Sequence, residues 1–315
     1  MDNDVLSDLL CTEQSGSPSL RRRAMGCMMG LLCGDALGSP LEFKGPKTLA
    51  DYYPNGVDTM VPGWDSTRNR KVGQITDDGE MALCLLHSLA AKGAYDADNV
   101  LRRYRNWLKS QPIDVGNTIS YALVGVQNAE SEANGALMRV APIAIKAAAD
   151  PGFDWQDAAA QDAALTHINP VCAHANIIYV ESVMLALKGE KPKRIYAQAL
   201  ARAEELKDDA LLKCLRASAT AEPAYYPCAG WVLIAMQCTY YWLLHAVDYP
   251  TAMLAIVNKL GDPDTNGAIA GALLGALFGV ASIPLRWRQL VLAFNARPKP
   301  YLAASSIPSL LAILA

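Results

Sequence analysis

Apolar residues recur every three to four positions along almost the whole chain, while alternating runs of Val, Ile and Thr are scarce. This period is typical of amphipathic α-helices. Ala, the residue with the highest helix propensity, fills 50 of the 315 positions. The pattern therefore predicts an all-α fold, with helices over residues 20–34, 77–92, 97–109, 117–130, 138–149, 155–164, 170–187, 194–206, 208–219, 228–246, 249–259, 266–281 and 284–295.

Residues 38–74 interrupt this pattern with a long stretch rich in Gly, Pro, Asp and Asn. Loops of this length are usually functional or disordered. The rest of the chain shows no repeat of fixed period and no linker that would divide two domains. We therefore expect one compact domain over residues 21–315. Residues 1–20 are acidic and polar, and we expect them to form a separate N-terminal arm.

The composition narrows the class of protein. Hydrophobic residues make up 52% and charged residues 19%, which is typical of a chain that forms a core. The net charge is −3 and the one basic cluster, residues 21–23, is short, so nothing indicates binding to nucleic acid. The uncharged runs 228–247 and 267–285 are interpreted as buried helices, not membrane spans. Eight cysteines without CxxC spacing predict buried thiols in a reducing cytoplasm.

Two clusters of acids stand directly before expected helices. The stretch "GQITDDGEM" carries Thr76, Asp77 and Asp78, and a lone cluster of this kind is explained by helix capping. A matching set, Asp262, Asp264 and Thr265, lies in "GDPDTNG". An EF-hand is excluded there, because the twelfth position of the loop is Leu instead of the required Glu. Asp35 and Glu42 form a third candidate group.

The two main clusters suggest a metal site if the fold brings them together. Neighbouring carboxylates repel one another unless they are protonated or bridged by cations. Ligands that are all oxygen favour Mg²⁺ or Mn²⁺ over Zn²⁺, and four Asp and two Thr suffice for two ions. Glycines recur every four residues at 26, 30 and 34 and again at 271, 275 and 279. They predict flat helix faces that pack closely and hold the acidic ends in place.

Six segments, in order, resemble signatures of the ADP-ribosylglycohydrolase family, which includes the dinitrogen-reductase-activating glycohydrolases. They are "GDALGSPLEF", "TDDGEM", "DVGNTISYAL", "NGALMRVAPI", "LTHINPVCAHAN" and "GDPDTNGAIAGALLGALFG". The resemblance implies a single all-α domain with a central di-metal cleft. It also implies two Mg²⁺ ions, with Mn²⁺ as an alternative, and cleavage of ADP-ribose from a modified group, often an arginine side chain.

The resemblance also implies roles for individual residues. The expected metal ligands are Thr76, Asp77, Asp78, Asp262, Asp264 and Thr265. The expected substrate contacts are Asp35, Asn134, Gly135, Ala136, Met138 and His167, although His167 is equally explained as a core histidine. Three carboxylates are candidates for the general base that activates water: Glu42, Asp77 and Asp78. The chain departs from the family pattern at Gly79, Ala133 and Leu260, without loss of a carboxylate.

These observations predict a cytoplasmic hydrolase that removes ADP-ribose from modified proteins, with arginine-linked groups favoured. The sequence does not separate arginine from serine linkage. One alternative is an immunity protein that neutralises an ADP-ribosylating toxin by hydrolysis or by contact through residues 1–20. Another is an inactive member that binds ADP-ribose, but the four retained Asp residues argue against it.

Overall fold

Short polar side chains set the starts of many helices. Each accepts a hydrogen bond from a backbone N–H in the first turn of the helix that follows, which satisfies a donor that the helix itself leaves unpaired. Residues of this kind are Ser19, Asp96, Asp154, Asn169, Asp208 and Asp248.

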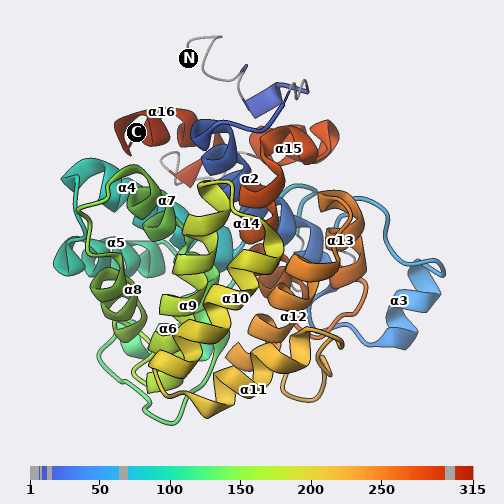
Figure 1. Cartoon of the computed structure of the whole chain (residues 1–315). Helices are drawn as coiled ribbons and strands as arrows, with labels where there is room; N and C mark the ends of the chain where they lie inside the picture. The colour runs from blue at the N-terminus through green and yellow to red at the C-terminus, as the bar shows by residue number, and fades with distance from the viewer. Residues whose placement is uncertain (1–6, 8, 13–15, 64–69, 295–301, 315) are drawn as a thin grey trace.

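The computed structural model describes residues 7, 9–12, 16–63, 70–294 and 302–314, and these residues contain no β-strand. The all-α prediction is confirmed (Figure 1). The helices in chain order are α2 (Leu20–Gly38), η1 (Ser39–Leu41), α3 (Pro46–Tyr52), α4 (Asp77–Lys92), α5 (Ala97–Lys109), α6 (Asn117–Leu123), η2 (Asn134–Arg139), α7 (Ala141–Ala149), α8 (Trp155–Ala164), α9 (Pro170–Leu187), α10 (Pro192–Glu205), α11 (Asp209–Ser218), α12 (Val232–His245), α13 (Tyr249–Val257), α14 (Pro263–Phe278), η3 (Val280–Ser282), α15 (Leu285–Ala293), η5 (Ala304–Ser306) and α16 (Ile307–Leu314).

Three predicted elements were wrong in detail. The helix expected over 117–130 ends at Leu123, and Gly125 follows with a left-handed φ of 98°. The helix expected over 138–149 is divided into η2 and α7. The expected loop 38–74 contains α3, which begins with Pro46 in the first turn, where a missing N–H does no harm. Helix α16 was not predicted.

Helices α2 and α14 lie against each other near the middle of the molecule (Figure 1). They run antiparallel, with Gly26 beside Gly275 and Gly34 beside Gly267. A Cβ built on Gly30 would lie only 2.1 Å from the carbonyl oxygen of Gly271, so no side chain fits at this crossing. The predicted glycine faces are therefore one interface. As a consequence, the C-terminal end of α2 and the N-terminal end of α14 lie at the same place.

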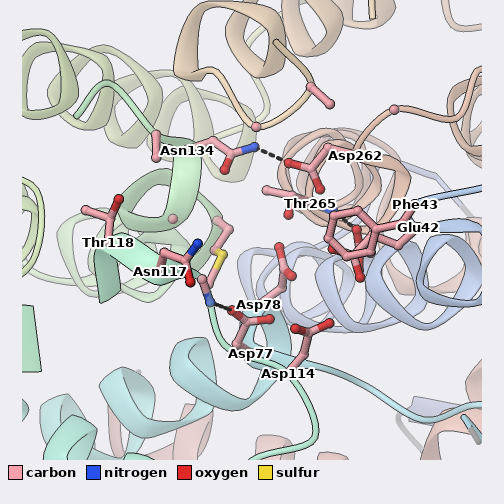
Figure 2. A pocket seen from close by; sticks show the side chains of 18 of the residues that line it. Glu42, Phe43, Asp77, Asp78, Asp114, Asn117, Thr118, Asn134, Asp262 and Thr265 are labelled. Atoms are coloured by element: carbon pink, nitrogen blue, oxygen red, sulfur yellow. Dashed lines mark hydrogen bonds between the residues drawn. The ribbon is translucent and has the colours of Figure 1, made fainter. Parts of the chain in front are cut away.

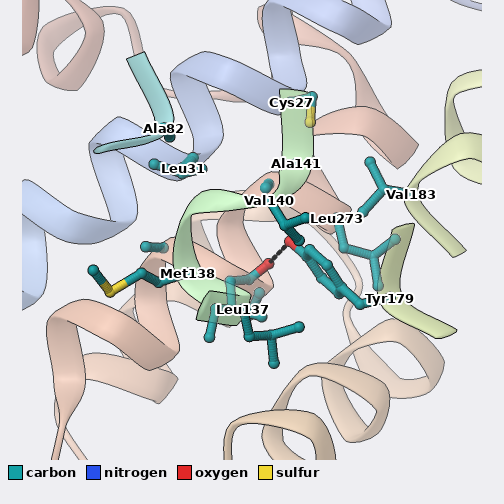
Figure 3. Packing of buried hydrophobic residues seen from close by; sticks show 14 of the residues in the cluster. Cys27, Leu31, Ala82, Leu137, Met138, Val140, Ala141, Tyr179, Val183 and Leu273 are labelled. Carbon is teal, nitrogen blue, oxygen red and sulfur yellow. Dashed lines mark hydrogen bonds between the residues drawn. The ribbon is translucent and has the colours of Figure 1, made fainter. Parts of the chain in front are cut away.

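Other helices pack around this pair and bury an extensive apolar core (Figure 3). Tyr179 of α9 donates a hydrogen bond to the carbonyl of Ile269 in α14 at 2.7 Å, which ties the outer helix to the central one. By length and composition alone, the stretch Leu20–Leu41 and helix α9 could cross a membrane. The apolar windows of these two stretches are 100% and 67% buried inside the protein, as expected for core helices.

Only part of the predicted N-terminal arm lies within the described residues. Leu9 is fully buried, and its carbonyl accepts a hydrogen bond from Arg288 of α15. The same guanidinium donates to the Cys11 carbonyl at 3.0 Å. Arg22, in the first turn of α2, contacts the sulfur of Cys11. This part of the arm therefore packs against α15 and α2, and none of its described residues lines the cavity described below.

Candidate functional site

A cavity of about 820 Å³ opens where the end of α2 meets the starts of α4 and α14. Six carboxylates line it, and the backbone brings them there from four separate segments. Figure 2 shows most of them directed toward one common space. The six acids are Glu42, Asp77, Asp78, Asp114, Asp262 and Asp264.

The tightest part of this group is formed by Glu42, Asp262 and Asp264. One oxygen from each of them lies within 4.8 Å of the other two. Asp262 is the N-cap of α14 and Asp264 lies in its first turn, so the glycine crossing of α2 and α14 determines where both stand. Asn134 donates a hydrogen bond to Asp262 at 2.6 Å and so fixes the orientation of that carboxylate.

Asp35 positions the acidic cluster at the start of α4, which carries Asp77 and Asp78, without itself lining the cavity. Its carboxylate accepts hydrogen bonds from the Thr76 N–H at 2.9 Å and from the Gly79 N–H at 3.0 Å. Both donors belong to the start of α4, so Asp35 caps that helix from the end of α2. Asp35 is fully buried and does not line the cavity, and its contact with the substrate stays a prediction. The absence of a side chain at Gly79 permits the capping contact, because a Cβ there would lie 2.8 Å from an Asp35 oxygen.

Asp77 and Asp78 project from the start of α4. Asp77 accepts a hydrogen bond from the Gly116 N–H at 3.1 Å (Figure 2). Asp78 accepts one from the Thr76 hydroxyl at 3.2 Å, while its other oxygen is buried without a hydrogen-bond partner among the described residues. Burial, with a smaller contribution from Asp114, raises the pKa of Asp77 to about 7. Burial and the nearby Asp35 raise the pKa of Asp78 well above its ordinary value.

Lys44 lines the cavity as well, and the buried cation Arg70 lies among these acids. Its side chain is 2% exposed and donates to Glu42 at 2.8 Å and to Asp114, with Asp264 at 3.8 Å. Burial disfavours its charge, but Asp264 and Glu42 more than compensate and raise the pKa of Arg70. Burial and the charge of Asp114 raise the pKa of Glu42 to about 8, although Arg70 opposes the shift. One guanidinium thus does not neutralise the group.

The cluster fits one or more hard divalent cations. Its donors are carboxylate and hydroxyl oxygens, the ligands that Mg²⁺ and Mn²⁺ prefer. The unpartnered oxygen of Asp78 and the 4.8 Å grouping of Glu42, Asp262 and Asp264 leave donor atoms available. Thr265 lies on the cavity wall, whereas Thr76 is fully buried behind it, with its hydroxyl 2.9 Å from Asp35 and 3.2 Å from Asp78.

The expected substrate contacts are only partly on the cavity wall. Asn134, Gly135, Met138 and His167 line it, while Ala136 is fully buried elsewhere. Gly135 permits a close approach, because a Cβ there would lie 3.1 Å from the His167 ring. Burial lowers the pKa of His167 to about 3, so the ring is neutral at physiological pH. Its Nδ1 contacts the Thr166 hydroxyl at 2.8 Å.

A buried ion pair supports the loop that carries Asn134 and Gly135. Arg139, at the end of η2, donates to Asp162 of α8 at 3.0 Å, and both side chains are fully buried. The same guanidinium donates to the Gly135 carbonyl at 3.2 Å and lies over the ring of Tyr104. These contacts fix the backbone of η2 against α8 and so determine where the loop faces the cavity.

Several residues of the cavity were missed by sequence reasoning. Asp114 lies in "DVGNTISYAL", which was matched as a segment without any residue being selected. Arg70 lies in a polar loop where nothing in the spacing indicates a contact with Glu42, 28 positions away. Phe43 and Tyr226 also line the cavity, and an exposed aromatic in a loop carries no periodic signal.

Comparison with known proteins identifies ADP-ribosyl hydrolases as relatives of this chain. A sequence model of the ADP-ribosylglycohydrolase family matches residues 16–308. The ADP-ribosyl-[dinitrogen reductase] glycohydrolase of Rhodospirillum rubrum is 33% identical over 279 residues, which cover 86% of this chain and 90% of the relative. An ADP-ribosylarginine hydrolase of Pseudomonas putida is 27% identical, over 85% of this chain and 74% of its own length. Human ADP-ribosylhydrolase ARH3 is 26% identical, over 85% and 88%.

The fold also matches a solved structure. The protein described as "ADP-ribosylglycohydrolase-related protein complex" superimposes with a TM-score of 0.75 at 24% sequence identity. The match covers 94% of this chain and 98% of the other. At this level of identity, the likeness establishes the shared helical architecture.

Proposed function

Because the chain belongs to the ADP-ribosylglycohydrolase family, whose members hydrolyse glycosidic bonds, we propose that it removes ADP-ribose from arginine side chains of modified proteins with the help of two divalent ions. The observation that carries the proposal is the convergence of six carboxylates on one cavity. Buried acids in such number require compensation by cations. We propose Mg²⁺, with Mn²⁺ as the alternative.

We assign the metal ligands to the starts of α4 and α14: Thr76, Asp77, Asp78, Asp262, Asp264 and Thr265. When bound, the ions would supply positive charge that fixes the ribose hydroxyls and lowers the cost of bringing the substrate among carboxylates. Asn134 and Gly135 border the same cavity, and we assign the diphosphate group to this loop. A volume of about 820 Å³ leaves room for a ligand of the size of ADP-ribose.

The chain's own carboxylates would handle the proton. Glu42, Asp77 or Asp78 would accept a proton from the water that attacks C1″ of the ribose. A general base works best when its pKa lies near the operating pH, and burial raises the pKa values of Glu42 and Asp77 above their ordinary values in the metal-free protein. Positive charge develops on the ribose ring as the glycosidic bond breaks, and the surrounding carboxylates stabilise it.

The acidity of the cavity supports arginine linkage over serine linkage. A modified arginine keeps a guanidinium group, which carboxylates bind through charge-assisted hydrogen bonds. Asp77 and Asp114 line the cavity and offer such acceptors. The Pseudomonas putida relative is named an ADP-ribosylarginine hydrolase. A serine linkage would present only neutral groups at this position.

The toxin-neutralising alternative stays a hypothesis. Its motivation was the acidic arm, and the described part of that arm, around Leu9 and Cys11, contacts Arg22 of α2 and Arg288 of α15. Inactive binding of ADP-ribose is disfavoured because Asp77, Asp78, Asp262 and Asp264 are all present at the cavity.

The proposal is tested by hydrolysis of two matched peptides, one ADP-ribosylated on arginine and one on serine. Each is incubated with the protein in Mg²⁺ or in EDTA, and free ADP-ribose is measured. We expect release from the arginine peptide in Mg²⁺ and little in EDTA. Equal release from both peptides would overturn the linkage, and no release from either would overturn the proposed function.

A further inference from the structure

The segment that carries Glu42 is tied to the opposite side of the cavity by one hydroxyl group. Tyr226 donates a hydrogen bond from its hydroxyl to the Lys44 carbonyl at 3.2 Å. The same hydroxyl accepts one from the N–H of Gly261 at 3.0 Å. Gly261 directly precedes Asp262, so Tyr226 bridges the segment of Glu42 and the loop of Asp262.

A second tie holds the same segment from inside. The Arg70 guanidinium donates to the Glu42 carboxylate at 2.8 Å and to the carbonyl of Ser39 at the start of η1. It also donates to Asp114. A planar guanidinium presents its donors in a fixed fork, so these contacts define one orientation of the carboxylate. Arg70 thus fixes the side chain of Glu42, whereas Tyr226 fixes the backbone two residues later.

The backbone between these ties is strained. Phe43 has a φ of 58°, in the left-handed region that bulky residues rarely adopt. Leu260, next to Gly261, has a φ of 64°. Such conformations persist only where the surrounding contacts determine them. The position of residues 42–45 therefore depends on the two ties more than on local preference.

We propose that Tyr226 and Arg70 are positioning residues that hold Glu42 against Asp262 and Asp264. The inference rests on the proposed function, in which Glu42 acts near the scissile bond. A catalytic carboxylate has to stay within hydrogen-bond reach of the proton that it accepts, and small displacements lower the rate strongly. When either tie is lost, the segment occupies its productive position for a smaller fraction of the time.

The test compares Tyr226→Phe, Arg70→Lys and Arg70→Gln with the wild type. The matched control is Tyr121→Phe, which removes a hydroxyl from an exposed tyrosine of α6 that does not line the cavity. Two quantities are measured: kcat and KM on a small ADP-ribosyl-arginine substrate in Mg²⁺, and hydrogen exchange of the backbone amides of residues 39–46 in EDTA. Thermal melts show whether each variant is folded.

We expect Tyr226→Phe to lower kcat about tenfold with a smaller change in KM, which is the scale of one lost hydrogen bond. Exchange of residues 39–46 should accelerate, and the melting temperature should change little. Arg70→Gln should lower kcat further, and Arg70→Lys should restore part of it because the charge is kept. Tyr121→Phe should match the wild type in both measurements.

Wild-type kcat and wild-type exchange in Tyr226→Phe would overturn the inference while leaving the proposed function intact. A loss of kcat that follows a lower melting temperature, with exchange of residues 39–46 unchanged, would also overturn it. If the wild type hydrolyses no ADP-ribosyl substrate, the proposed function fails. The exchange measurement, which needs neither substrate nor metal, then still shows whether the two ties hold the segment.

Discussion

Helices α2 and α14 meet along their whole length, but the two ends of this pair differ in chemistry. At one end, Gly26 lies against Gly275 with backbone touching backbone, and the buried Arg23 of α2 donates hydrogen bonds to the carbonyl groups of Ala276 and Leu277 near the end of α14. At the other end, the same crossing brings Gly38 against the backbone of Asp264, and Asp35, Asp262 and Asp264 stand nearby. One end is close-packed, with its one named charge satisfied by backbone carbonyls, and the other is a cavity lined by acids.

The difference shows how a site of repelling charges is held together. Burial raises the pKa values of Asp78 and Asp264, and the neighbouring carboxylates, which repel one another, raise them further. A flexible scaffold would relax and separate them. The glycine interface prevents this, because two backbones in contact have little room to move. Stability supplied at the glycine end thus permits an unfavourable arrangement at the acidic end.

The largest effect on stability is expected from a methyl group added within the glycine crossing of α2 and α14. Gly30→Ala places a Cβ where it would lie 2.1 Å from the Gly271 carbonyl oxygen, and backbone cannot move aside easily. We expect a loss of about 3 kcal/mol in the free energy of unfolding, at the upper end of overpacking effects. Urea denaturation followed by circular dichroism measures it. The control is Gly152→Ala, where the nearest atom is 3.5 Å away. Equal stability of the two variants would refute the tight crossing.

A change at the acidic end should affect catalysis instead. Glu42→Gln keeps the size of the side chain but removes its basicity, so kcat should fall about 10²- to 10⁴-fold, as for loss of a general base. The circular dichroism spectrum should stay that of the wild type. Glu205→Gln, at an exposed carboxylate of α10, serves as the control. Wild-type turnover in Glu42→Gln would remove Glu42 from the mechanism.

The acidic end should also make the metal-free protein sensitive to pH. The pKa of Asp77 rises from 3.8 to about 7 on folding, and that of Glu42 from 4.5 to about 8. Between about pH 4 and pH 8 the folded state therefore binds more protons than the unfolded state, and stability falls as pH rises. In EDTA, the melting temperature should decrease between pH 5 and pH 8, and Mg²⁺ should reduce that slope. A melting temperature in EDTA that rises over this range would contradict the shifts.

The sequence predicted the helices and the close-packing glycine faces because both leave a periodic signal, but it did not predict that the two faces pack against each other. It also selected Asp77, Asp78, Asp262 and Asp264, whose clustering before apolar helices is visible in one dimension. It did not anticipate that Asp35 caps the start of α4, because capping a neighbouring helix and touching a ligand call for the same carboxylate. It missed Arg70 and Tyr226, since their partners lie 28 and 35 or more positions away in loops without a period.

The convergence of the acids on a metal site is tested most directly by thermal melts of Asp264→Asn, in EDTA and in Mg²⁺. Our account predicts that the melting temperature in EDTA holds or rises, because one repelling charge is gone. The stabilisation by Mg²⁺, about 2.7 kcal/mol for the wild type at a hundredfold excess over Kd, should shrink. Asp248→Ala, which removes the N-cap side chain of α13, is the control and should lower the melting temperature without changing the Mg²⁺ shift. If Asp264→Asn instead lowers the melting temperature and keeps the full Mg²⁺ shift, as this control does, Asp264 only stabilises the first turn of α14, and the metal site is contradicted.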